Sequence, residues 1–109
     1  MVTIRRTHRD VVFRAIADPT RRRILGLLRG GRRTVGEIAR NFHTSRPAIS
    51  KHLRVLGSAG LVVTRRKGTA RICDLNAGPL RAIDAWLHDY EAFWSQTMRS
   101  LKQYVEETR

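Results

Sequence analysis

The sequence predicts a mainly α-helical fold with a small β-hairpin, arranged as a winged helix-turn-helix with a long C-terminal dimerisation helix. Two short helical segments are joined by a tight turn at 43–44, and two β-rich segments flank a basic turn at 67–68. Apolar residues then repeat with a heptad period over 79–107. A chain of 109 residues has room for one domain. We therefore expect a single domain over 1–109, with the winged helix-turn-helix at 7–76 and the dimerisation helix at 79–107.

The first two predicted helices have clear start and stop signals. A short apolar face predicts a helix over 8–17. Asp18 then supplies an N-cap, and Pro19 occupies the first helical position, where its missing N–H costs nothing. The second helix therefore begins at Pro19, and Gly30 and Gly31 end it.

Two further helices form the predicted helix-turn-helix. Thr34 and Glu37 have the spacing of a capping box, which starts a third helix over 34–42. Ser45 caps a fourth helix over 45–57. The apolar stripe of this fourth helix follows spacings of four and three and consists of Ile49, Leu53 and Leu56.

A hairpin and a long helix complete the expected fold. Residues 61–64 and 70–75 are rich in β-branched side chains and predict two strands around the turn at Lys67-Gly68. The segment 79–107 is interpreted as one helix, roughly 42 Å long. The preceding body is too small to cover its apolar seam, so part of the seam should pack on a second copy of the chain; packing on its own domain is the alternative. The seam consists of Leu80, Ile83, Leu87, Tyr90, Trp94, Thr97, Leu101 and Tyr104.

The charge of the chain is large and unevenly distributed. Lys and Arg number 22 against nine Asp and Glu, a net charge of +13. Residues 1–78 hold 18 basic and four acidic residues, whereas residues 79–109 hold four and five. Nearly all the basic residues are Arg, which suits bidentate contacts to phosphate and guanine; the bias of a GC-rich genome is the alternative reason. A basic body of this kind predicts a polyanionic partner, most often nucleic acid and less often a membrane surface.

The fourth predicted helix carries a cationic face opposite its apolar stripe. Helical periodicity places on this face Arg46, Pro47, Ser50, Lys51 and Arg54. These groups suit the base edges and flanking phosphates of double-stranded DNA in the major groove. A basic wing at 65–71 would lie along the neighbouring backbone or minor groove and contains Arg65, Arg66, Lys67 and Arg71. A solvated charged face is the alternative for each cluster taken alone.

Several segments resemble ArsR-type winged-helix repressors in order and spacing. They are ADPTRRRIL at 17–25, VGEIA at 35–39, SRPAISKHLRVL at 45–56 and AGLV at 59–62. The C-terminal segment is similar to the metal-free, SdpR-like branch of that family, on the evidence of Trp86, Phe93 and Trp94.

The resemblance implies a homodimeric transcriptional repressor, including repressors of their own genes, that binds a two-fold symmetric operator. It implies DNA contacts by the wing arginines and by Ser45, Arg46, Ala48, Ser50, Lys51 and His52. It also implies pairing through the first and last helices, so that the expected dimer interface contains Val12, Ile16, Ile83, Leu87, Tyr90, Trp94, Thr97 and Leu101.

The chain departs from the metal-sensing members of this family. Those members carry a Cys-Val-Cys run at the start of the third helix, where this chain has Thr34 and Gly36, neither of which can bind a metal as a thiolate. Asp84 and His88 lie four residues apart, but no later His completes a tetrahedral site, so we interpret them as an exposed helix pair. We expect no metal and no cofactor; a metal-responsive repressor is the alternative.

The remaining features point away from catalysis and membranes. The sequence shows no paired carboxylates, no Ser/His/Asp or Cys/His arrangement and no phosphate-binding glycine loop, so we expect no enzyme. Cys73, the single cysteine, is interpreted as a small buried residue, with a redox sensor as the alternative. We find no signal peptide and no apolar stretch of ~18 residues, so we expect a cytoplasmic protein. A winged-helix protein-interaction module without DNA binding is the structural alternative.

Two positions have more than one interpretation. Arg21, Arg22 and Arg23 lie in the first turn of a helix, where the macrodipole disfavours positive charge. Either an external anion or the acidic C-terminal segment of a partner subunit could compensate them. His52 lies three residues after Ile49, so it either contacts DNA or is half-buried and hydrogen-bonded.

Overall fold

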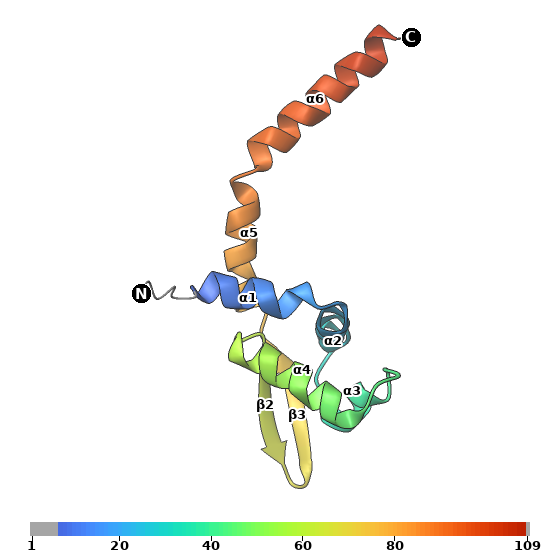
Figure 1. Ribbon diagram of the computed structural model, residues 1–109, viewed down its shortest axis with the longest axis vertical. Helices are drawn as coiled ribbons and strands as arrows, with labels where there is room; N and C mark the ends of the chain where they lie inside the picture. Colours follow the sequence, from blue (N-terminus) through green and yellow to red (C-terminus); the bar gives the residue numbers. More distant parts are fainter. Residues whose placement is uncertain (1–6, 109) are drawn as a thin grey trace, which may run out of the picture.

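The computed structural model describes residues 7–108, in which a winged-helix body carries a projecting C-terminal helix (Figure 1). A 3-10 helix at Gly78–Leu80 leads into the C-terminal helices. In chain order the other elements are α1 (His8–Ala17), α2 (Pro19–Arg29), β1 (Arg33–Thr34), α3 (Val35–Ala39), α4 (Arg46–Ser58), β2 (Val62–Lys67), β3 (Ala70–Leu75), α5 (Arg81–His88) and α6 (Glu91–Glu107).

One apolar core holds α1 to α4 against the sheet. The predicted stripe of the fourth helix, Ile49, Leu53 and Leu56, is buried in this core, which confirms its inward orientation. Ile24 of α2 and Ile38 of α3 are fully buried beside it. Because burial fixes one side of α4, the opposite side of that helix faces solvent.

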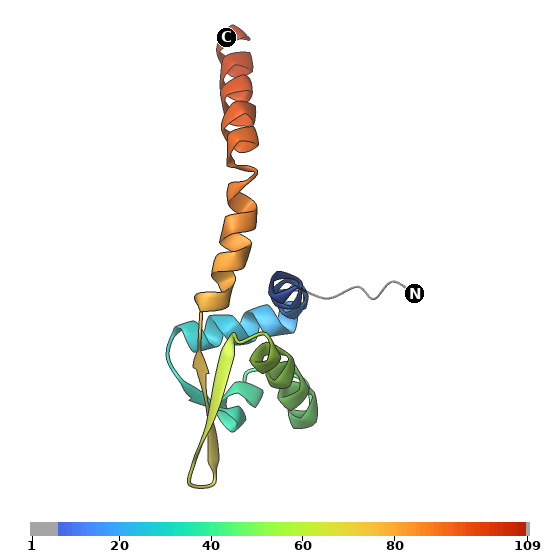
Figure 2. The same ribbon diagram turned by 90° about the vertical axis from the view of Figure 1, so that its left-hand side faces the viewer.

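The sheet has three antiparallel strands in the order β1–β3–β2, and β2 and β3 form the wing below the helices (Figures 1 and 2). β2 runs three residues beyond the predicted end at 64, because the basic residues that follow still pair with β3. The turn contains Gly68 with φ of +62°, a conformation that suits glycine. β1 has only two residues, too few to show an alternating pattern, so the sequence did not indicate it.

Side-chain caps set the helix starts where the sequence predicted them. Asp18 accepts a 3.0 Å hydrogen bond from the amide three residues on and caps α2. Ser45 caps α4 in the same way at 3.2 Å. Thr34 and Glu37 form the expected capping box. α3 nevertheless ends at Ala39, earlier than the predicted end at 42, because the last amides bond carbonyls three residues back and tighten the chain into a turn.

The C-terminal segment consists of two helices, so the prediction of one helix over 79–107 is wrong. α5 ends at His88 and α6 begins at Glu91, and the amides of Asp89 and Tyr90 donate to carbonyls three residues back. A 2.9 Å contact between His88 Nδ1 and Glu91 Oε2 spans the break. Neither Gly nor Pro marks this position and the apolar spacing continues across it, so no signal in the sequence indicates the break.

α5 and α6 differ in what they contact. α5 packs against α1, where the Phe13 and Trp86 rings meet edge to face with centroids 5.1 Å apart. Ile83 is half-buried against the core, so the start of the seam packs on its own domain. α6 projects away from the body, and all its residues are exposed (Figures 1 and 2). Val12 is fully buried within its own chain and cannot reach a partner, so its expected place in a dimer interface is wrong.

Candidate nucleic-acid interface

α4 presents a cationic face to solvent. Arg46, Lys51 and Arg54 are exposed, whereas Ser50 and Ala48 are half-buried at the border of the core. Pro47, which occupies the first turn without an N–H, is exposed as well. Of the five residues that periodicity placed opposite the apolar stripe, all but Ser50 are therefore exposed. Their contact with DNA stays a prediction.

One face of the wing carries two uncompensated arginines. In the register of β2 and β3, Arg66 lies opposite Arg71, and Thr64 lies opposite Cys73. Cross-strand partners point to the same side of a sheet, so both arginines lie on one face. Both are exposed, and neither forms an ion pair within residues 7–108. Like charges opposite each other destabilise a hairpin, and a bound anion would remove that repulsion.

The other face of the wing is partly neutralised. Arg65 donates from Nη2 to Oδ2 of Asp74 at 2.6 Å, and Nε of Arg32 lies 3.3 Å from Oδ1 of the same carboxylate. Strand alternation places Arg65 and Lys67 on this face, away from Arg66 and Arg71. The four basic wing residues that the sequence grouped together therefore belong to two separate surfaces.

Two open grooves lie between α4 and the wing. The first has a volume of about 380 Å³ and its polar lining consists of Ser50, Arg54, Thr64 and Arg71. The second, of about 330 Å³, lies at the start of α4 and is lined by Arg40, Arg46, Thr69 and Arg71, among others. No acidic side chain lines either groove, and Arg71 lines both. Arg40 was missed from the sequence, because a single basic residue at the end of a short helix carries no pattern.

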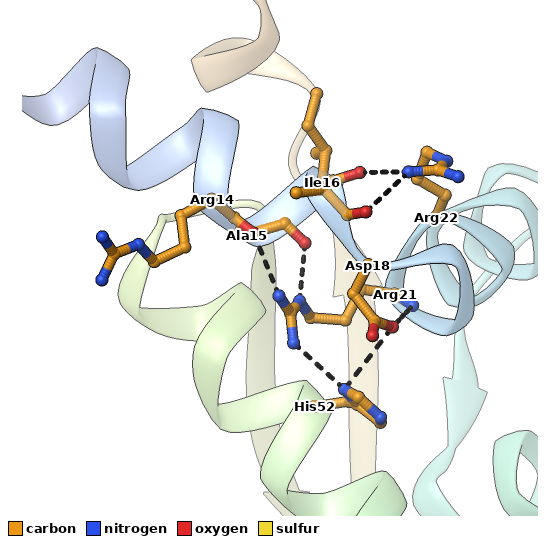
Figure 3. A network of polar contacts seen from close by, with 8 residues as sticks. Arg14, Ala15, Ile16, Asp18, Arg21, Arg22 and His52 are labelled. Atoms are coloured by element: carbon orange, nitrogen blue, oxygen red, sulfur yellow. Dashed lines mark hydrogen bonds and ion pairs between the residues drawn. The ribbon is translucent and has the colours of Figure 1, made fainter.

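His52 lies on a third side of α4, toward α1 and α2 (Figure 3). Its Nδ1 is 3.3 Å from Nη1 of Arg21 and 3.9 Å from Oδ2 of Asp18. The side chain is 23% exposed. His52 is therefore half-buried and hydrogen-bonded, which is the second of the two alternatives that the sequence left open.

The arginines at the start of α2 are engaged within their own chain. Arg21 donates to the carbonyls of Ala15 and Arg14, and Arg22 donates to those of Ile16 and Ala17 (Figure 3). These carbonyls end α1 and lack partners inside the helix. The guanidinium of Arg23 lies over the ring of Phe42, 4.8 Å from its centroid. Arg21 and Arg22 therefore find hydrogen-bond partners at the end of α1, which the sequence did not indicate.

Two side chains have pKa values displaced by their surroundings. The backbone amide of Arg21, which bonds the Asp18 carboxylate, lowers the pKa of Asp18, and the positive charge of the Arg21 side chain adds to this effect. Burial raises the pKa of the Cys73 thiol, although the Thr64 hydroxyl lies 3.7 Å from its sulfur. Cys73 is fully buried, as expected, and a protonated, enclosed thiol is a poor nucleophile.

The acidic and histidine side chains do not assemble around a metal. Within residues 7–108, no three His, Cys, Asp or Glu side chains lie close enough together to hold a metal ion. His88 pairs with Glu91 at 2.9 Å, so the expected Asp84–His88 pair is wrong; the helix break brings Glu91 to His88 instead. Over the same described residues, no helix combines the length and apolar character that a membrane span requires.

Sequence comparison identifies the family. The family model of bacterial regulatory proteins of the arsR family matches residues 18–64. The transcriptional repressor SdpR of Bacillus subtilis is 44% identical over 79 residues, which are 72% of this chain and 88% of that repressor.

Solved structures share the fold. A crystal structure of an ArsR family transcriptional regulator has a TM-score of 0.74 at 36% identity and covers 81% of this chain and 91% of that one. The NMR structure of the homodimeric winged helix-turn-helix DNA-binding domain of a possible ArsR-family transcriptional regulator from Mycobacterium bovis has a TM-score of 0.64 at 31% identity, with coverages of 78% and 82%. This chain therefore belongs to the arsR family of bacterial regulatory proteins, which are transcriptional regulators and not enzymes, and it has their winged helix-turn-helix fold.

Proposed function

We propose that this protein is a homodimeric transcriptional repressor that binds a palindromic operator in double-stranded DNA, including DNA upstream of its own gene. α4 enters the major groove, and the wing at 65–71 follows the neighbouring backbone or minor groove. As a DNA-binding regulator of a bacterial family, it acts in the cytoplasm.

The observation that carries this proposal is the set of uncompensated arginines around the two grooves between α4 and the wing. Arg40, Arg46, Arg54 and Arg71 line these grooves with no acidic side chain beside them. A DNA backbone would neutralise these guanidinium groups and release its condensed counterions. Lys51, which is exposed on α4, adds a further donor for phosphates or base edges.

The apolar stripe of α5 and α6 supports pairing with a second copy. Leu87, Tyr90, Trp94 and Leu101 are exposed and follow one another at helical spacings. Thr97 has the same spacing and lies on the same stripe. The similar domain from Mycobacterium bovis is a homodimer. Pairing along this stripe would present two copies of α4 to half-sites about one helical turn of DNA apart, roughly 34–36 Å.

Two arginine substitutions test the assigned roles. Arg46→Ala should weaken operator binding by ~1–3 kcal/mol and relax sequence preference, on the proposal that Arg46, the first residue of α4, reads a guanine. Arg66→Ala should weaken binding to every sequence similarly and lower the salt slope by about one, because it removes a phosphate contact. Fluorescence anisotropy with an operator duplex and a scrambled duplex, over a salt series, measures both quantities.

Arg65→Ala is the matched control, since Arg65 neighbours Arg66 on β2 but pairs with Asp74 on the other wing face. It should change DNA affinity less than Arg66→Ala does. Equal losses on operator and scrambled DNA for both Arg46→Ala and Arg66→Ala would contradict the division of roles.

A further inference from the structure

His52 belongs to the DNA-reading helix but faces the interior junction of α1 and α2. Neither groove between α4 and the wing is lined by His52, whereas Ser50 and Arg54 of the same helix line the first of them. Its Nδ1 lies 3.3 Å from Nη1 of Arg21. A guanidinium can only donate hydrogen bonds, so Nδ1 is the acceptor in this contact.

Arg21 joins His52 to the end of α1. The same guanidinium donates from Nε to the carbonyl of Ala15 at 2.6 Å and from Nη2 to the carbonyl of Arg14 at 3.0 Å (Figure 3). Every nitrogen of the group is therefore engaged. Because the guanidinium is planar and rigid, these bonds fix where His52, and with it the middle of α4, lies relative to the last turn of α1.

α1 in turn contacts α5, the first of the two C-terminal helices. Phe13 of α1 packs edge to face on Trp86 of α5, and Trp86 packs on Tyr90, with ring centroids 5.1 Å apart in both pairs. A continuous series of contacts thus runs from α5 through α1 and Arg21 to α4. A change at His52 would alter the orientation of α4 relative to the helices that carry the apolar stripe.

We propose that His52 is a positioning residue that orients α4 for operator binding through Arg21, and that it does not contact DNA itself. This inference rests on the proposed operator binding. A misoriented α4 would lose base contacts while the surface arginines still reach phosphates. Loss of the His52–Arg21 contact should therefore reduce operator affinity more than affinity for scrambled DNA, with an unchanged salt slope.

A pair of substitutions separates positioning from direct contact. His52→Asn places an amide oxygen near the site of Nδ1 and can still accept from Arg21, whereas His52→Gln places its amide near the site of Nε2. We expect His52→Ala and His52→Gln to lower operator affinity about tenfold, and His52→Asn to retain affinity within about threefold. The measurement is the anisotropy salt series, with circular dichroism to confirm that each variant is folded.

Arg21 provides an independent readout. Arg21→Lys removes the planar guanidinium that bonds both His52 and the end of α1. In this background, His52→Ala should therefore add little to the loss of operator affinity. Arg54→Ala is the matched control on α4, because Arg54 lines the first groove and its removal should lower the salt slope by about one.

Several results would overturn the inference. Rescue by His52→Gln and not by His52→Asn would show that the Nε2 side of the ring contacts DNA. A salt slope lowered by about one in His52→Ala would also show direct contact. Full operator affinity in His52→Ala, or equal losses in the Asn and Gln variants, would exclude a role through Arg21. If the wild-type chain binds operator and scrambled DNA equally, the proposed function fails. If the wild type prefers the operator and the His52 variants bind it as tightly as the wild type does, only the inference about His52 fails.

Discussion

Arg21, Arg65 and Arg66 show how residues of one type take different roles. Arg21 bonds the last carbonyls of α1, Arg65 pairs with Asp74, and Arg66 faces its like-charged partner Arg71 across the wing. The sequence predicted that all of them are cationic and that the wing is basic. It could not assign their partners, because a carbonyl six residues back or a carboxylate on the next strand becomes a neighbour only after packing and strand register are set.

Asp18 should contribute stability that depends on pH. Its carboxylate caps α2, so Asp18→Ala should lower the free energy of unfolding by about 0.5–2 kcal/mol at neutral pH. Because the folded-state pKa of Asp18 is lowered, this contribution is present above the unfolded-state pKa and is lost as the pH falls through the folded-state pKa. Urea unfolding of both chains over a pH series measures the difference.

Asp84→Ala is the control for this series. Asp84 is an exposed acidic residue in the first turn of α5, and its side chain forms no capping hydrogen bond. The free energy of unfolding of the wild type should approach that of Asp18→Ala at strongly acidic pH. If the difference between the two stayed constant over the pH series, the Asp18 carboxylate would not be its source.

At the scale of elements, the sequence predicted most of the fold because each helix start has a local signal. Asp18 and Ser45 accept capping bonds where expected, and burial of Ile49 and its neighbours orients α4. This is also why the outward face of α4 could be predicted. Two features of the structure could not be predicted. β1 exists only through its pairing with β3, and the break at Asp89–Tyr90 carries no Gly or Pro.

Two glycines should respond in opposite ways to the same substitution. Gly68 in the wing turn has φ of +62°, so Gly68→Ala should lower the free energy of unfolding by about 1 kcal/mol, even though nothing lies within 4 Å of an added Cβ. Gly26 lies inside α2, also with nothing within 4 Å, so Gly26→Ala should raise that free energy by about 0.5–1 kcal/mol. Thermal and urea unfolding measure both, and stabilisation by Gly68→Ala would refute the left-handed turn.

At the scale of the whole molecule, the chain divides into a basic body and a near-neutral C-terminal segment, to which we assign two kinds of contact. α6 extends from the body (Figure 2). Its side chains Phe93, Trp94, Met98 and Leu101 are exposed and form an apolar surface that water solvates poorly. The sequence predicted Trp94 and Leu101 of this surface from their helical spacing, whereas Phe93 and Met98 lie outside the predicted heptad positions. It could not show that the start of the segment packs on its own core, because that depends on where α1 lies.

Substitution within this stripe should dissociate a dimer without unfolding the body. Trp94→Ala combined with Leu101→Ala should raise the dimer dissociation constant at least about tenfold, because large apolar side chains dominate such interfaces. No residue of α6 is buried in the body, so the unfolding transition of the body should persist. Sedimentation equilibrium measures association, and Arg99→Ala on the polar side of α6 is the control. Unchanged self-association in the double variant would exclude this stripe as the interface.

The most direct test of the account is an anisotropy titration of the wild-type protein, over a salt series, against its own upstream DNA and a scrambled duplex. We expect tighter binding to the upstream DNA and a steep fall of affinity with salt, with a slope of roughly −0.9 for each phosphate neutralised. Equal affinity for the two duplexes with little dependence on salt would contradict the claim that α4 and the wing form a DNA-reading surface.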